Sequence, residues 1–136
     1  SKIRRRSARN LPRKPRGGVM KVPDENTSVK ELRDLVAAFV AEREWERFHT
    51  PKNLAMSIAI EAAELMELFQ WRSGEDPLDD AERRELQREL ADVMIYCLAM
   101  ANAAGIDLAD AVREKVGLNA LKYPADRYRG RYKIEE

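Results

Sequence analysis

Cysteine and histidine are scarce in this chain of 136 residues. Cys97 is the only cysteine, so an internal disulfide is excluded, and a lone thiol in an apolar helical run suits a small core residue in a reducing compartment. His49 is the only histidine, which disfavours a di-iron helical bundle, because such a site takes a Glu-x-x-His pair from each of two helices.

Long apolar runs are also missing. No stretch reaches the roughly 20 apolar residues that a membrane span needs, and the basic start lacks the apolar segment of a secretory signal. Apolar residues make up 44% of the chain and charged residues 36%, which is typical of amphipathic helices around one core. We therefore expect a single-domain cytoplasmic protein without a membrane partner.

Acidic residues are missing from the start of the chain. Residues 1–21 carry nine Lys or Arg and no acid, whereas the rest carries 16 basic and 24 acidic residues. Several Pro and Gly and no helical period predict that residues 1–27 form a disordered basic arm. A solvated tail is the simpler interpretation of this arm, so we expect no nucleic-acid contact by the arm, and the acidic remainder argues against a broad basic footprint. The alternative function is a helical nucleic-acid-binding module that uses the arm.

Alternating strand patterns are absent, and the apolar spacing instead predicts helices. Ser28 with Glu31 fits a capping box, Pro51 suits a first helical turn, and Gly105 suits a helix end. The expected helices cover about residues 28–48, 51–71, 80–104 and 107–122. Short connections favour an all-α, four-helix-bundle-like domain over residues 28–124, followed by a polar, irregular tail over 125–136.

Two pairs of acids differ from the acids on the solvated helix faces. A step of three residues from Ile58 reaches Glu61 and a further step of four reaches Leu65, so the Glu61 carboxylate should project toward the core, and Glu64 follows one turn later. Asp92 is the only charge in residues 90–101, and a helix that is apolar all round is a buried helix. Glu89 lies one turn before it. An uncompensated buried carboxylate costs several kcal/mol, so a positive group is expected nearby.

Antiparallel packing of these two helices would bring the four carboxylates together. Their mutual repulsion would require a cation, and carboxylate oxygens are the hard ligands that Mg²⁺ or Mn²⁺ prefers. Either pair by itself is common on solvent-facing helices. Both pairs together, at spacing three on consecutive long helices, favour a site for a metal and a phosphate substrate.

The pattern Glu61-x-x-Glu64, a gap of 24 residues, and Glu89-x-x-Asp92 resembles the metal signature of the MazG-like nucleotide pyrophosphohydrolases. Further segments resemble the dCTP pyrophosphatase branch of that family, and the likeness covers about residues 30–124. These segments are Phe39-x-x-Glu42-Arg43-x-Trp45-Glu46-x-Phe48-His49-x-Pro51-x-Asn53-Leu54, Glu67-Leu68-Phe69-Gln70-Trp71, Asp92-Val93-x-Ile95-Tyr96 and Lys115-x-x-x-Asn119-x-x-x-Tyr123-Pro124.

The resemblance implies an all-α enzyme that uses Mg²⁺ to hydrolyse a (deoxy)nucleoside triphosphate, here dCTP or a modified dCTP, to the monophosphate and pyrophosphate. It also implies a homo-oligomer, either a dimer or a tetramer of paired dimers, with sites formed partly between subunits. The implied metal ligands are Glu61, Glu64, Glu89 and Asp92.

Roles for other residues follow from this resemblance. A Glu would serve as the general base, and the candidates are Glu64 and Glu67. Three residues of the last expected helix share one face and would hold the phosphates, namely Lys115, Asn119 and Lys122. The residues expected to surround the base and sugar are Trp45, His49, Trp71 and Tyr96.

Overall fold

The structure, a computed structural model, describes residues 21–132, and these residues form helices and no strand, as expected for an all-α fold. Residues 1–20 of the expected arm and residues 133–136 of the expected tail lie outside this range. The elements in chain order are η1 (Asp24–Asn26), α2 (Val29–Glu42), η2 (Glu46–Phe48), α3 (Pro51–Glu67), α4 (Asp80–Ala104), α5 (Leu108–Lys122) and α6 (Ala125–Tyr128).

Side-chain caps start the four long helices. Ser28, Thr50, Asp79 and Asp107 each accept a hydrogen bond from the backbone N–H three residues later. Such a cap satisfies one of the four N–H groups that a helix leaves without a partner at its start. The helices consequently begin within a residue or two of the positions that the sequence predicts.

The end of α2 differs from the prediction, because the helix stops at Glu42 rather than near residues 45–48. Glu44 has a φ of +53°, and its N–H donates to Ala41 O at 3.0 Å. The Trp45 N–H donates to Val40 O at 3.1 Å, which completes a Schellman motif. A glycine normally holds the left-handed position, so a glutamate there gives no sequence signal for a helix end.

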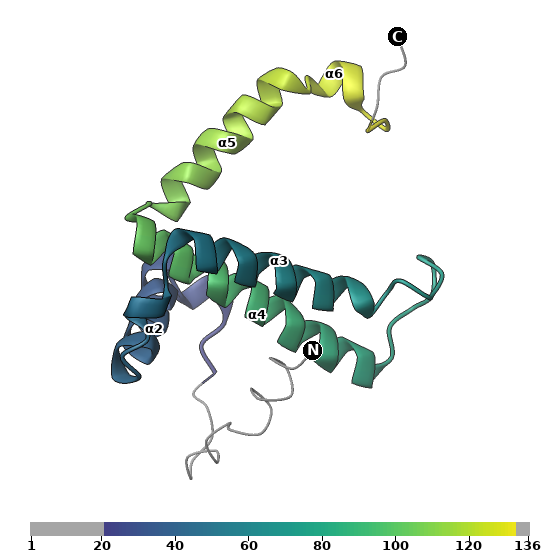
Figure 1. Ribbon diagram of the computed structural model, residues 1–136. Coiled ribbons are helices and arrows are strands. Elements are labelled where there is room, and N and C mark those ends of the chain that lie inside the picture. The colour runs from purple at the N-terminus through teal and green to yellow at the C-terminus, as the bar shows by residue number, and fades with distance from the viewer. Residues whose placement is uncertain (1–20, 133–136) are drawn as a thin grey trace.

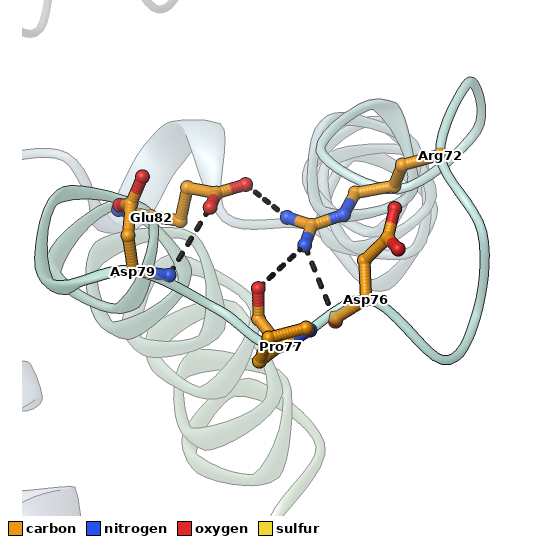
Figure 2. Close-up of polar contacts among 5 residues, drawn as sticks. All are labelled: Arg72, Asp76, Pro77, Asp79 and Glu82. Atoms are coloured by element: carbon orange, nitrogen blue, oxygen red, sulfur yellow. Dashed lines mark hydrogen bonds and ion pairs between the residues drawn. The ribbon is translucent and has the colours of Figure 1, made fainter.

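The connection from α3 to α4 begins earlier than expected, because α3 ends at Glu67 rather than near Trp71. Arg72 fixes this connection in Figure 2: its guanidinium pairs with Glu82 and donates to Pro77 O at 3.0 Å and to Asp76 O at 3.3 Å. Glu82 also completes the capping box of α4 with Asp79. One arginine thus joins the connection to the first turn of α4.

Helix α3 runs antiparallel along α4, and α2 packs across the C-terminal half of α4 (Figure 1). The core lies where the three helices meet, and its buried members are Val36, Val40, Leu54, Leu98 and Ala99. Arg33 also joins α2 to α4, because it donates to Asn102 Oδ1 at 3.0 Å while Asn102 Nδ2 donates to Arg33 O at 3.0 Å. These contacts place α2 and α3 on α4, which therefore carries the site.

Helix α5 leaves α4 at an angle of 104° and extends away from the other helices in Figure 1. Gly105 permits this bend with a φ of +65°. Beyond α5, the expected irregular tail contains the short helix α6. Within residues 21–132 no single helix has the length and apolarity to cross a membrane, and the bent pair α4 and α5 meets those criteria only jointly.

Candidate metal centre

The inner face of α3 carries two buried acids. Glu61 is 6% exposed and Glu64 is 3% exposed, and Leu54 on the same face is the most deeply buried large side chain among the described residues. A step of three turns a helix by about 300°, so Glu61 and Glu64 stay on one face. The predicted orientation of Glu61 toward the core is confirmed.

Helix α4 brings two more acids opposite these. Glu89 is 3% exposed, whereas Asp92 is exposed. The expectation that Asp92 is buried on every side is therefore wrong. Asp92 faces Glu61 of α3, so its exposure arises on the acidic side of α4 and not on the opposite side, where Leu90 and Met94 are exposed.

The acids of the two helices converge. One carboxylate oxygen from each of Glu61, Glu89 and Asp92 lies within 4.8 Å of the others. Glu61 Oε2 is buried and has no hydrogen-bond partner among the described residues. Hard oxygen ligands from two helices, one with an unused buried lone pair, fit a divalent cation such as Mg²⁺.

The electrostatics at Glu61 show how unfavourable this arrangement is without a cation. Burial, as the largest cause, a hydrogen bond with Glu64, and the negative charges of Glu64, Asp92 and Glu89 together raise the pKa of Glu61 from its ordinary value of 4.5 to about 7. Each cause disfavours the ionised form, so a cation would reverse the balance.

The two candidates for the general base lie in different surroundings. Glu64 is buried beside Glu61, with which it shares a hydrogen bond. Glu67 is exposed at the last residue of α3. Two steps of three turn the helix by about 120° in total relative to Glu61, which carries Glu67 away from the acidic face.

One face of α4 connects the acids to a cavity. Glu89, Asp92, Tyr96 and Ala99 follow one another at spacings of three, four and three, so they lie along a single stripe. Tyr96 is half-buried, and burial together with the charges of Glu61 and Asp92 raises the pKa of its phenol. The stripe therefore runs from the carboxylates past a tyrosine hydroxyl to small side chains.

The cavity has a volume of about 300 Å³ and lies between α2, η2 and the C-terminal half of α4. His49, one of the residues expected around the base, lines it. The other lining residues are Val36, Ala37, Val40, Glu46, Ala99, Asn102 and Ala103. No sequence signal marked Glu46 as a lining residue of the cavity. It lies in a segment where Glu and Arg alternate, and that pattern is typical of a solvent-facing surface.

The two tryptophans lie on the surface of the protomer. The Trp45 ring packs edge-on against Phe39 at 5.8 Å between centroids, next to Arg43, whose guanidinium lies 3.6 Å from the centre of the Phe39 ring. Trp71 is 90% exposed in the connection that Arg72 holds. Neither indole is among the residues lining the cavity.

The expected phosphate-binding residues lie on α5, away from the acids. Lys115 and Lys122 are exposed and Asn119 is half-buried. Since α5 makes no extensive contact with α3 or α4 in the described residues, a single chain does not bring these three side chains to the carboxylates. Their assigned roles stay predictions, as do those of the other site residues.

Comparisons of this chain with a family model and with individual proteins agree on one family. The model of the MazG-like family matches residues 56–133. The chain is 44% identical over 107 residues to dCTP pyrophosphatase 1 of Mus musculus and 43% identical over 102 residues to dCTP pyrophosphatase 1 of Homo sapiens. These alignments cover 76% and 72% of this chain, but only 63% and 60% of the two curated relatives.

One solved structure is similar to this chain over nearly the whole length of the solved protein. A pyrophosphatase from Archaeoglobus fulgidus DSM 4304 is 43% identical to this chain, with a TM-score of 0.65. The match covers 76% of this chain and 99% of that one. The fold described above is therefore that of a known pyrophosphatase.

Proposed function

The chain belongs to the MazG-like family, and on that premise we propose that it is a Mg²⁺-dependent nucleoside triphosphate pyrophosphohydrolase. The proposed substrate is dCTP or a modified dCTP, and the products are the monophosphate and pyrophosphate, a reaction that would remove unwanted nucleotides from the pool. One observation carries the proposal: the carboxylate oxygens of Glu61, Glu89 and Asp92 lie within 4.8 Å of one another at the junction of α3 and α4.

The proposed metal ligands are these three residues and Glu64. A bound Mg²⁺ or Mn²⁺ would neutralise phosphate charge and lower the pKa of a water. The protein's own part is to hold ligands on two packed helices and to exclude solvent from Glu61, Glu64 and Glu89. Glu64 is the better candidate for the general base, because Glu67 lies off the acidic face.

The stripe along α4 suggests how the nucleotide would lie. Asp92 and Ala99 are seven residues apart, which is about 10 Å along the helix axis. With the triphosphate at the carboxylates, the base would reach the cavity lined by His49, and Tyr96 would lie beside the sugar. This arrangement agrees with the roles expected for His49 and Tyr96.

A homo-oligomer, either a dimer or a tetramer of paired dimers, is part of the proposal. Helix α5 is apolar on opposite sides, with Val112 and Val116 on one and Leu118 and Leu121 on the other, and all four are exposed. A second copy that covers α5 would remove this surface from water. It would also bring a further set of Lys115, Asn119 and Lys122 near another copy's acids.

A panel of nucleoside triphosphates tests the proposed activity. The purified chain, given Mg²⁺, should release pyrophosphate and a monophosphate from dCTP faster than from the other triphosphates. The same samples with EDTA are the control for metal dependence. Intact triphosphates at every enzyme concentration, with a folded protein, would refute the proposal.

A further inference from the structure

The segment that follows α5 is basic, although the molecule around it is acidic. Residues 123–132 contain three Arg, three Tyr and one acid, whereas residues 22–136 together carry 16 basic and 24 acidic residues. The three arginines, all exposed, are Arg127, Arg129 and Arg131. In Figure 1, α6 lies beyond the far end of α5, away from α2, α3 and α4. Positive charge is thus concentrated at one end of the described chain.

These arginines have no partner in the described part of the chain. Within residues 21–132 the guanidinium groups of Arg127, Arg129 and Arg131 make no hydrogen bond or ion pair. By contrast, the guanidinium of Arg72 pairs with Glu82 and holds a connection of the fold. The three arginines of residues 123–132 are therefore available to an anion.

Tyrosines alternate with these cations. Tyr123 and Tyr128 pack edge-on, with 5.2 Å between the ring centroids and 90° between the ring planes. Tyr132 is 88% exposed, so most of its ring is open to solvent. Proteins that bind single-stranded nucleic acid combine cations along the phosphate backbone with aromatic rings on which the bases stack. Residues 123–132 carry both kinds of group.

Backbone hydrogen bonds order this segment before any ligand binds. The Tyr128 N–H donates to Pro124 O at 3.1 Å, and the Arg131 N–H donates to Tyr128 O at 2.8 Å. Gly130 has a φ of +75°, which glycine adopts without strain, and it places no side chain between Arg129 and Arg131. An ordered segment loses less conformational entropy on binding, so its contacts contribute more to affinity.

We propose that residues 123–132 bind single-stranded nucleic acid, with the arginines on phosphates and Tyr132 stacked on a base. A single strand is favoured over a duplex, because stacking on Tyr132 needs an uncovered base face. A membrane surface is disfavoured, because residues 123–132 contain no Leu, Ile, Phe or Trp to insert among the lipids. This binding goes beyond the proposed function, since the segment lies apart from the carboxylates of α3 and α4.

Fluorescence anisotropy of the full chain with a fluorescein-labelled oligothymidylate tests the role of the arginines. The buffer contains EDTA, so that no metal bridges the carboxylates to the probe. Arg129→Gln combined with Arg131→Gln should weaken binding and reduce the slope of log K against log salt by about 1.4, since each phosphate contact on a single strand contributes about 0.7. Arg83→Gln with Arg84→Gln, two exposed residues of α4, removes the same charge and should keep the parent's slope.

The stacking contact has a test of its own. Tyr132→Ala should weaken binding of the oligothymidylate about 5- to 150-fold, which is the equivalent of about 1–3 kcal/mol for one stacked base. Tyr132→Phe is the matched control, because it keeps the ring and removes only the hydroxyl, and it should bind as the parent does. An equal loss in both variants would contradict stacking on this ring.

Two further probes identify the source of negative charge. A hairpin duplex with the same number of phosphates and vesicles that contain phosphatidylserine should both bind more weakly than the single strand. Equal binding of all three probes, or of none, would overturn the inference. Unchanged binding in the Arg129 and Arg131 double variant would also overturn it and would assign the contact to another segment, such as the basic residues 1–21. Release of pyrophosphate is measured separately, so these outcomes leave the proposed function standing.

Discussion

Glu61 is a carboxyl group that its surroundings hold partly protonated near neutral pH. Its folded-state pKa is about 7, whereas its ordinary value is 4.5. Between these values the folded protein binds more protons than the unfolded chain, so stability is highest below the lower value and falls as pH rises. A divalent cation competes with that proton and favours the ionised form.

Metal-induced stabilisation should therefore depend on pH. In EDTA, the melting temperature should fall as pH rises from about 4.5 to about 7. With millimolar Mg²⁺ the fall should be reduced, so the increase in melting temperature caused by Mg²⁺ should grow with pH. Scanning fluorimetry at several pH values measures both, and Glu61→Gln is the control that should flatten the trend. The same Mg²⁺-induced increase in melting temperature at both ends of this pH range would contradict the prediction.

Asp92 separates a role in the metal site from a role in folding. Because Asp92 is exposed, Asp92→Asn should leave the helical circular dichroism and the melting temperature in EDTA unchanged or slightly raised, through relief of repulsion. Turnover should fall by about two orders of magnitude or more, since a metal ion contributes several kcal/mol to such reactions. Glu75→Gln, an exposed acid in the connection before α4, is the control. Full activity of Asp92→Asn would exclude it as an essential ligand.

Glu44 holds a left-handed conformation that glycine adopts without strain. Glu44→Gly should raise the free energy of unfolding by about 0.5–1 kcal/mol, because relief of this strain exceeds the extra entropy of glycine in the unfolded chain. Urea unfolding measures the change. The control is Glu42→Gly in the last helical turn of α2, which should destabilise by a similar amount. A loss of stability in Glu44→Gly would contradict the assigned turn.

At the scale of elements, Arg72 holds the connection between α3 and α4 to the first turn of α4. Arg72→Met should lower the free energy of unfolding by about 1–3 kcal/mol, because the Arg72 side chain is only 18% exposed and several hydrogen bonds are lost. Lys30→Met is the matched control: the Lys30–Asp34 pair is 82% and 63% exposed, so its loss should change stability little. Equal effects of the two changes in urea unfolding would show that Arg72 does not hold the connection.

Helix starts were predictable from the sequence, whereas some ends were not. Ser28, Asp79 and Asp107 cap their helices through contacts that lie within a few residues, so local sequence determines them. The end of α2 depends on a left-handed glutamate, which propensity does not signal. The connection after α3 is held by Arg72, whose partners lie later in the same loop and in the first turn of α4.

At the scale of the whole molecule, a single chain leaves much apolar surface in water. Leu121 is 80% exposed, Val116 is 61% exposed and Leu90 on α4 is 55% exposed. Contiguous exposed apolar patches indicate association surfaces. The proposed oligomer therefore involves the outer face of α4 as well as α5.

A charge placed in this surface should weaken association. Val116→Glu should shift the protein toward the monomer at micromolar concentration in sedimentation velocity, because an unpaired buried charge costs several kcal/mol. Arg113→Glu, an exposed charge change on the same helix, is the control for charge alone. A parent chain that is monomeric at high micromolar concentration would contradict the proposed oligomer.

The sequence by itself determined the helices and most of the acidic site. Spacing placed Glu61 on the inner face of α3 and paired Glu89 with Asp92 on α4, because helical periodicity is a local property. Tertiary structure decided what local spacing cannot: Asp92 is exposed, and α5 leaves α4 at 104°. Exposure depends on which helices cover a face, and that is set by packing between residues far apart in the chain.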